Sequence, residues 1–220
     1  MERCPEPELM EDDAQARAYA EADFEEPHRE VARLLDACCA DWPPEGAALD
    51  LGCGPGDISI RFARVHPGWR VDGVDGSAAM LRHGHAAVAA AGLEERVRLH
   101  QAYLPRDAPP RPQYDLVFSN SLLHHLADPA VLWQAVANHA RAGAPVFIMD
   151  LMRPRSVEEV HRLVEEHCAG EPEVLRRDFH NSLYAAYRVE EVAEQLRTAG
   201  LAHLEVRAVT NRHLAASGRR

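Results

Sequence analysis

Three glycines, Gly52, Gly54 and Gly56, alternate with other residues in the stretch LDLGCGPGD, which follows a short apolar run. The apolar run predicts a buried strand, and the residues after the glycines predict a helix. Glycine lets a backbone turn sharply and approach a ligand without a Cβ in the way. A tight turn with no ligand needs only one glycine, so three in alternation indicate a binding site at this strand-to-helix turn.

The spacing of these glycines differs from that of two common nucleotide-binding turns. The dinucleotide fingerprint is G-x-G-x-x-G, and its third glycine falls where this chain has Asp57. A phosphate-binding P-loop requires G-K-S or G-K-T, and neither follows here. An acidic residue at the start of the next helix also disfavours a pyrophosphate at that position.

Asp75 ends the next expected strand and gives a second indication of the ligand. A carboxylate at this point can accept hydrogen bonds from the 2′ and 3′ hydroxyls of a ribose. The alternative is that Asp75 only caps the helix that follows it. Together, the glycine turn and Asp75 predict a ligand that contains a nucleoside.

The composition limits the classes of protein to consider. The chain has 220 residues, of which 46% are apolar, and a formal net charge of −11. It is long enough for one domain with a sizeable core. An acidic surface repels phosphate backbones, which makes nucleic acid an unlikely partner. No apolar run approaches the ~18 residues that span a bilayer, so we expect no membrane partner.

The cysteines and histidines predict neither a disulfide framework nor a metal site. Five cysteines at irregular spacing and an acidic N-terminus indicate a cytoplasmic protein with reduced thiols. Cys38 and Cys39 are adjacent, with no second pair at zinc spacing. His83 and His85 are two positions apart on an expected helix and therefore face different directions. We expect no bound metal.

Short apolar runs alternate with helical patterns along the middle of the chain. Strands are expected at residues 47–51, 70–75, 96–101, 114–120 and 145–151. Helices are expected between them at 57–65, 77–92 and 129–141. Such alternation predicts a parallel sheet with helices on both faces.

The two ends of the chain differ from this pattern. Further helices are expected at 14–22, after Pro27, at 156–168, within a loop-and-helix segment at 178–187, and at 188–200. The last two apolar stretches, 203–209 and 211–217, are separated by a short turn. They predict an antiparallel hairpin at the edge of the sheet.

Five segments carry a resemblance to a known family: ALDLGCGPGDISIRFA, VDGVDGSAAML, HQAYLP, YDLVFSNSLLHHLADP and PVFIMDLMRP. They occur in the order and spacing of the class I S-adenosylmethionine-dependent methyltransferases. The chain most resembles the branch that includes quinone-biosynthesis and other small-molecule methyltransferases. The resemblance is strong over residues 47–154 and weak outside them.

The resemblance implies a fold and a division of the chain. The fold is α/β, with a doubly wound, mostly parallel seven-stranded sheet of the Rossmann-like methyltransferase type. A C-terminal antiparallel hairpin lies at the sheet edge, and a helical lid lies at the N-terminus. Residues 1–44 would form the lid and residues 45–220 the cofactor-binding domain, with a substrate-recognition insertion at about 152–188.

The resemblance also implies S-adenosyl-L-methionine as the cofactor and S-adenosyl-L-homocysteine as its product. The residues it assigns to the methionine portion are Asp50, Gly52, Gly54 and Gly56. Asp75 would bind the ribose hydroxyls beside Gly76, and Met80 would pack against the adenine. Gln101, followed by Ala102, stands where the family often has an Asp that meets the adenine amino group. Ser119 and Asn120 would lie near the amino group of the cofactor.

Methyl transfer from a sulfonium mainly requires that the nucleophile be aligned and water excluded. The family therefore has no universal catalytic residue, and three candidates stand out here. Asp150, at the end of the fifth strand, could orient an acceptor, or it could cap the sheet edge. His124 could act as a base near neutral pH, whereas His125 is typical of a packed residue. Tyr19 either closes over the cofactor or is an ordinary aromatic on a helix face.

The segment RRDFHNSLYAAYR crowds polar and aromatic groups into a few positions of the expected insertion. It predicts an acceptor pocket that suits a small polar or charged molecule better than a prenyl-tailed quinone. The alternative is a solvated helix. Arg153 could bind a carboxylate of the acceptor, or it could form a surface ion pair. The residues expected to contact the substrate are Arg153, Asp178, His180, Asn181 and Tyr184.

The sequence therefore predicts a methyltransferase that acts on a small molecule by direct displacement at the sulfonium methyl. One alternative is an RNA or protein methyltransferase, although the chain has no basic stripe. Another is a module that binds the cofactor without catalysis. A nicotinamide dehydrogenase is disfavoured by the missing third fingerprint glycine. The oligomeric state, monomer or homodimer, stays open.

Overall fold

The computed structural model describes residues 1–7, 9, 11–22, 24–39 and 41–220. Its centre is a seven-stranded sheet in the order β3-β2-β1-β4-β5-β7-β6. The strands are β1 (Gly46–Leu51), β2 (Trp69–Asp75), β3 (Val97–Gln101), β4 (Leu116–Asn120), β5 (Pro145–Leu151), β6 (Glu205–Ala208) and β7 (His213–Arg219). All neighbouring strands are parallel except β7, which is antiparallel to both β5 and β6.

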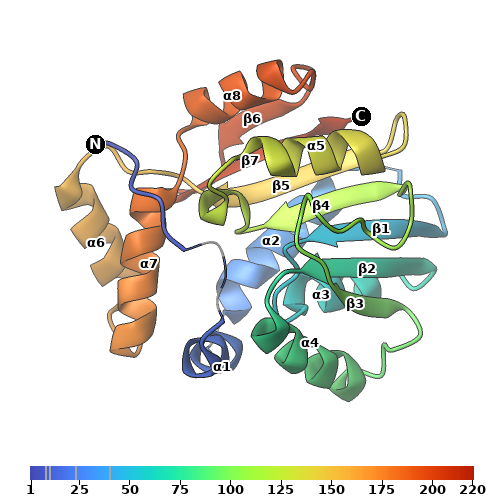
Figure 1. The fold of residues 1–220 in the computed structure, drawn as a ribbon, viewed down its shortest axis with the longest axis horizontal. Helices are drawn as coiled ribbons and strands as arrows, with labels where there is room; N and C mark the ends of the chain where they lie inside the picture. Colours follow the sequence, from blue (N-terminus) through green and yellow to red (C-terminus); the bar gives the residue numbers. More distant parts are fainter. Residues whose placement is uncertain (8, 10, 23, 40) are drawn as a thin grey trace.

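Helices cover both faces of the sheet (Figure 1). Their bounds are α1 (Asp13–Glu21), α2 (Glu25–Ala37), α3 (Asp57–Val65), α4 (Ala78–Ala90), α5 (Ala130–His139), α6 (Val157–Cys168), α7 (Glu173–Ala185) and α8 (Val189–Thr198). A short 3₁₀ helix, η1, spans Leu123–His125. Over the described residues, no helix is both long and apolar enough to cross a membrane.

The core has two layers because successive side chains on a strand point to opposite faces. On one face, Leu49 and Leu51 of β1 pack with Trp133 of α5 and Leu196 of α8. On the other face, α2, α3 and α4 pack against the strands; for example, Phe62 of α3 lies against Phe118 of β4. This arrangement confirms the prediction of a doubly wound, mostly parallel sheet. The C-terminal hairpin is also confirmed, with β6 at the edge and β7 between it and β5.

Two element boundaries differ from the sequence prediction. Helix α2 begins at Glu25 rather than after Pro27. Proline is accepted there because backbone N–H groups in the first turn have no helical partner. Helix α7 begins at Glu173, directly after Pro172, so residues 178–187 are mostly the second half of a helix and not a loop.

Helices α6 and α7 stand beside one end of the sheet, next to the first residues of the chain (Figure 1). The backbone N–H of Cys4 donates a hydrogen bond to the Tyr184 carbonyl at 3.0 Å. The Arg3 guanidinium donates to the carbonyls of Ala185 and His124 at 2.6 and 3.0 Å. These contacts tie the N-terminal segment to α7 and η1, at the edge where β1, β2, β4 and β5 end.

The turn from β1 to α3 uses three left-handed glycines. Gly52, Gly54 and Gly56 have φ angles of 71°, 51° and 80°. A left-handed backbone costs an L-residue with a Cβ about 1–2 kcal/mol. A Cβ on Gly56 would also lie 3.2 Å from a methyl of Leu99. The glycines are therefore required by the backbone, whatever the turn binds.

We predict that Gly56→Ala lowers the free energy of unfolding by at least about 1 kcal/mol, because the left-handed backbone is strained by a Cβ. Gly92→Ala should show the conformational cost alone, since Gly92 has a φ of 66° and open space around it. Gly170→Ala is the control, with open space and no left-handed backbone. Urea unfolding measures all three. A Gly56→Ala protein as stable as Gly170→Ala would contradict the prediction.

Candidate active site

A cavity of about 670 Å³ opens where β1, β2, β4 and β5 end. That volume is in the range of small-molecule sites. The register of the strands explains why these ends coincide. Leu51 pairs with both Val74 and Ser119, and Asn120 pairs with Met149. The residues that follow these strands therefore meet at one level, and helices α1, α2, α6 and α7 contribute to the wall.

The glycine turn forms part of this wall. Gly52 and Gly54 line the cavity. The backbone N–H groups of Gly52 and Cys53 both donate to the Val74 carbonyl, at 2.8 and 3.1 Å, which holds the turn against β2. Gly56 does not appear in the cavity wall that the structure describes. Its predicted contact with a ligand is replaced by a structural role at the start of α3.

Asp75 faces the cavity at the end of β2 and is held by two backbone groups. One carboxylate oxygen accepts from the Gly54 N–H at 2.9 Å, and the other accepts from the Ser77 N–H at 2.8 Å. Burial raises the pKa of this carboxyl group. Helix α4 is capped by Ser77, whose hydroxyl accepts from the Met80 N–H. Asp75 is therefore not the cap of that helix, and each of its oxygens keeps a further lone pair for a ligand.

Asp50 lies deeper, at the end of β1, and is 2% exposed. Its carboxylate accepts a hydrogen bond from the Ser59 hydroxyl at 2.7 Å. Burial and the nearby charge of Asp75 raise the pKa of Asp50 to about 7, against the lowering effect of Ser59. Asp50 still contacts the cavity. It can therefore exchange a proton near neutral pH at the site where the sequence predicts the methionine portion of a cofactor.

The other predicted binding residues divide into two groups. Those that line the cavity are Gly76, Met80, Ala102 and Asn120. Ser119 is buried behind the wall, where its hydroxyl donates to the Leu51 carbonyl at 2.6 Å. Gln101 is exposed and its amide donates to the Gly76 carbonyl at 3.2 Å. Neither side chain reaches the cavity as described, so each supports a neighbouring strand end instead.

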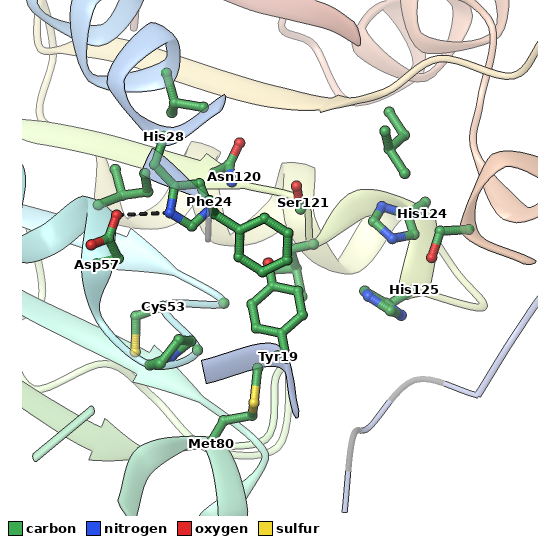
Figure 2. A pocket seen from close by; sticks show the side chains of 18 of the residues that line it. Tyr19, Phe24, His28, Cys53, Asp57, Met80, Asn120, Ser121, His124 and His125 are labelled. Carbon is green, nitrogen blue, oxygen red and sulfur yellow. Dashed lines mark hydrogen bonds and ion pairs between the residues drawn. The ribbon is translucent and has the colours of Figure 1, made fainter. Parts of the chain in front are cut away.

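Helices α1 and α2 cover the cavity with aromatic rings (Figure 2). The Tyr19 and Phe24 rings are 4.8 Å apart between centroids, and the Phe24 and His28 rings are 5.2 Å apart. Burial raises the pKa of the Tyr19 hydroxyl to about 12, so it stays protonated at neutral pH. Phe24 and His28 were not singled out by the sequence, because their spacing fits any amphipathic helix.

Asp57, the first residue of α3, binds helix α2 to the core of the domain. Its carboxylate lies 2.7 Å from Nδ1 of His28 and accepts from Nε of Arg61 at 2.6 Å. Burial alone would raise the pKa of Asp57, but His28 and Arg61 outweigh it and hold the pKa below its usual range. The acidic residue at the start of α3 thus pairs with α2.

His124 and Asp150 form a buried pair between η1 and β5. Nδ1 of His124 lies 2.5 Å from one oxygen of Asp150, and the other oxygen accepts from the Leu123 N–H at 2.7 Å. Burial disfavours both charges, yet each partner outweighs it: the pKa of His124 is raised and that of Asp150 is lowered. His124 lines the cavity, whereas Asp150 stands behind it. Asp150 therefore both caps the edge of the sheet and fixes the imidazole of His124.

Ser121 lines this side of the cavity, and Glu6 lies behind it against the two histidines. Ser121 has a left-handed backbone (φ 58°), which turns the chain from β4 into η1. Oε1 of Glu6, from the N-terminal segment, lies 3.5 Å from Nε2 of His124 and 3.3 Å from Nδ1 of His125. Burial raises the pKa of Glu6. Burial and the charge of His124 lower the pKa of His125 to about 3.

Helix α7 presents only one of its faces to the cavity. Asp178 lies on that face and accepts from the Gln15 amide at 2.7 Å. The residues of α7 that line the cavity are Leu175, Asp178, Phe179 and Ser182, the spacing of one helical face. His180, Asn181 and Tyr184 fall on other faces, and the His180 ring lies against Tyr184. The prediction that these three contact a substrate is not supported by their positions.

Arg153 is also absent from the described cavity wall. It is 5% exposed, and its guanidinium donates to the Ala186 carbonyl at 3.0 Å and to Glu191 at 2.5 Å. It therefore holds the end of α7 to α8. Arg153 therefore forms an ion pair, which was the alternative to binding a carboxylate of the acceptor. The pair is buried on the arginine side and does not lie at the surface.

Comparisons with known proteins agree with this geometry. A family model described as "Methyltransferase domain" matches residues 49–146. A trans-aconitate 2-methyltransferase of Azoarcus sp. is 37% identical over 119 residues, which are 54% of this chain and 43% of that protein. A ubiquinone biosynthesis O-methyltransferase of Ralstonia nicotianae is 29% identical over 176 residues, 76% of this chain and 70% of that protein. Residues 49–146 therefore match a methyltransferase domain, and the chain resembles the class I S-adenosylmethionine-dependent methyltransferases.

Solved structures share the fold of this chain. A S-adenosylmethionine-dependent methyltransferase from Aquifex aeolicus has a TM-score of 0.67 at 17% identity, over 94% of this chain and 98% of that one. A phosphoethanolamine N-methyltransferase 2 from Haemonchus contortus has a TM-score of 0.68 at 19% identity, over 90% of this chain and 44% of that one. The chain spans less than half the length of the first trans-aconitate methyltransferases that it matches.

The cavity fits S-adenosylmethionine, the cofactor that this resemblance implies. The glycines let the backbone lie close to the opposite wall: a Cβ on Gly52 would lie 2.9 Å from Leu122, and one on Gly76 would lie 2.7 Å from Leu9, so a side chain at either position would displace that wall. Asp75 offers lone pairs to hydroxyl groups beside this turn. Met80 supplies a polarizable apolar contact for a base on the same side. The donor set thus suits a nucleoside with an amino-acid tail.

We predict that Asp75→Ala weakens the binding of S-adenosylhomocysteine by about 1–3 kcal/mol, because the ribose hydroxyls lose their acceptor. Asp41→Ala is the control, since Asp41 is exposed and outside the cavity wall. Titration calorimetry measures the affinity, and circular dichroism checks that both variants fold. Equal affinity of the two folded variants would contradict the ribose assignment.

We predict a pH effect on stability from Asp50. An unfolded Asp titrates near 3.8, whereas Asp50 in the folded chain titrates near 7. Between these values the folded state holds one more proton than the unfolded state, so this contribution to stability falls as pH rises. Asp50→Asn should therefore make the free energy of unfolding decline less steeply from pH 5 to about 7. Urea unfolding across this range tests it, and parallel curves for both proteins would contradict it.

Proposed function

We propose that this protein transfers a methyl group from S-adenosylmethionine to a small acceptor by direct displacement. The observation that carries the proposal is that Asp75 and the glycine turn line the same cavity as His124 and Tyr19. One side of the cavity thus suits the cofactor, and the other side offers polar groups to a second molecule. The cofactor, when bound, supplies a methyl group that its sulfonium makes electrophilic.

The cofactor half of the cavity is formed by the ends of β1, β2 and β4. We assign the methionine portion to Asp50, Gly52 and Gly54, with Asn120 near its amino group. Asp75 holds the ribose by accepting hydrogen bonds from its hydroxyls. Gly76, Met80 and Ala102 surround the adenine. Each of these residues lines the cavity, which supports the assignment.

The acceptor half is formed by η1, α1 and α7. His124 contacts the reacting group of the acceptor, and Asp150 positions its imidazole. Tyr19 donates a hydrogen bond from a hydroxyl that stays protonated, and Asp178 accepts one from a polar acceptor. We assign the lid to residues 1–44 and acceptor recognition to the segment 152–188, of which α7 contributes the inner face. Closing the cover over the site excludes water, which alignment of the nucleophile requires.

A small polar molecule is the acceptor class best supported. The names of the similar proteins, trans-aconitate and ubiquinone biosynthesis methyltransferases, both refer to small molecules. The net charge of −11 disfavours an RNA acceptor. We further infer that the enzyme works in the cytoplasm, in keeping with five cysteines that form no disulfide.

The acceptor class is tested with methyl-labelled S-adenosylmethionine and a cell extract separated into small-molecule, RNA and protein fractions. Label in the small-molecule fraction, lost with the Asp75→Ala protein, is the expected result, and mass spectrometry then identifies the product. Label confined to the RNA or protein fraction would show that the acceptor is RNA or protein and not a small molecule. Cofactor binding without label in any fraction would favour a non-catalytic module.

We predict that His124→Gln lowers the turnover number on the order of 100-fold or more, since His124 contacts the reacting group. Asp150→Asn should also lower the turnover number, because it frees the imidazole of His124 to rotate. The affinity for S-adenosylhomocysteine should stay within about threefold in any variant that folds. His85→Asn, at an exposed position of α4, is the matched control. Normal turnover by a folded His124→Gln protein would contradict this role.

A further inference from the structure

Three side chains from two distant segments bring nitrogen and oxygen donors together beside the cavity, which both histidines line. Glu6 comes from the N-terminal segment, and His124 and His125 come from η1. One donor atom from each lies within 4.8 Å of the other two. Oε1 of Glu6 is 3.3 Å from Nδ1 of His125 and 3.5 Å from Nε2 of His124.

These separations match those of a metal site. A zinc ion bound to nitrogen and oxygen ligands at about 2.0–2.1 Å in a tetrahedral arrangement keeps its ligand atoms about 3.3–3.4 Å apart. Both measured separations from Glu6 are close to that spacing. The third separation, between the two ring nitrogens, is no more than 4.8 Å.

Hydrogen bonding alone does not account for the cluster. Nδ1 of His125 is buried and has no hydrogen-bond partner among the described residues. Oε1 of Glu6 is near enough, but the two atoms are not aligned as donor and acceptor. A buried ring nitrogen without a partner is costly. A metal ion would use its lone pair.

The surroundings of the cluster are those of metal ligands. Histidine ligands donate their other ring N–H to a carboxylate or a carbonyl, which fixes the ring. Here Nδ1 of His124 is held by Asp150 at 2.5 Å, and the Pro7 carbonyl accepts a hydrogen bond from the His125 ring. The Ser182 hydroxyl donates to Glu6 at 2.9 Å. Each of the three donor groups is therefore oriented by a second contact.

We propose that Glu6, His124 and His125 bind one Zn²⁺, with the fourth position open to the cavity. Zinc suits two imidazoles and one carboxylate, and methyl transfer is redox-neutral, so a metal without redox chemistry fits. The open position faces the acceptor half because both histidines line the cavity. It would bind an oxygen or sulfur atom of the acceptor, so that with the metal bound His124 acts on the acceptor through the ion and not by direct contact. That last role rests on the proposed function, whereas the metal site itself does not.

The metal site is tested without cofactor or acceptor. Tag-free full-length protein is treated with a chelator, given one equivalent of Zn²⁺, desalted and analysed for zinc by mass spectrometry. We expect one zinc per chain, and at least tenfold weaker retention in Glu6→Gln and in His125→Asn. Glu2→Gln and His85→Asn are matched controls that should retain the metal, because both residues are exposed and outside the cluster.

A second measurement keeps the test decisive if a variant fails to fold. Co²⁺ added to the unmodified metal-free protein should give the visible spectrum of a four-coordinate nitrogen and oxygen site. Thiolate charge-transfer bands would assign the metal to cysteines and overturn the proposal. No zinc retained by the unmodified protein, or equal retention by folded Glu6→Gln and Glu2→Gln, would also overturn it. None of these results depends on methyl transfer, so that proposal stands or fails separately.

Discussion

The parallel strands β1, β2, β4 and β5 end in register, and this alignment determines where the candidate site forms. β1 lies between β2 and β4, and the chain connections run in opposite directions on its two sides. No helix can therefore cross the sheet edge at this point, and a crevice is left above it. Asp50, Asp75, Asn120 and Asp150 all end or nearly end their strands. Their side chains converge only because the strands stop at the same level.

The crevice becomes a cavity through elements that are not part of the parallel core. Helix α2 is joined to it by the pairing of His28 with Asp57, and α1 is joined to α7 by Gln15 and Asp178. The N-terminal segment adds Arg3 contacts to η1 and α7. These polar contacts are partly exposed and individually weak. The cover is therefore held by several small contributions and not by one large one.

Local patterns predicted the core of the molecule well. The strands and helices between residues 47 and 151 follow from apolar periodicity, and the need for Gly52 and Gly54 follows from the backbone. The sequence alone could not decide whether Asp75 caps helix α4. The structure decides it, because the cap of that helix is Ser77. Gln101 and Ser119 were placed correctly on their strands, but the direction of each side chain depends on neighbours that the sequence does not show.

The acceptor half was predicted less well for two physical reasons. Treating residues 178–187 as part loop hid the helical face that separates Asp178 from His180, Asn181 and Tyr184. Arg153 was predicted to bind a carboxylate of the acceptor because its partner, Glu191, lies 38 residues away in α8. Glu6 meets His124 and His125 across most of the chain. Contacts between such distant segments leave no periodic signal in one sequence.

The most direct test of this account is a crystal structure of the protein with S-adenosylhomocysteine. The account predicts the ribose hydroxyls within hydrogen-bonding distance of Asp75 and the homocysteine beside the Gly52–Gly54 turn, with the sulfur directed toward η1. A ligand bound outside the cavity, or a ribose held by groups other than Asp75, would contradict it.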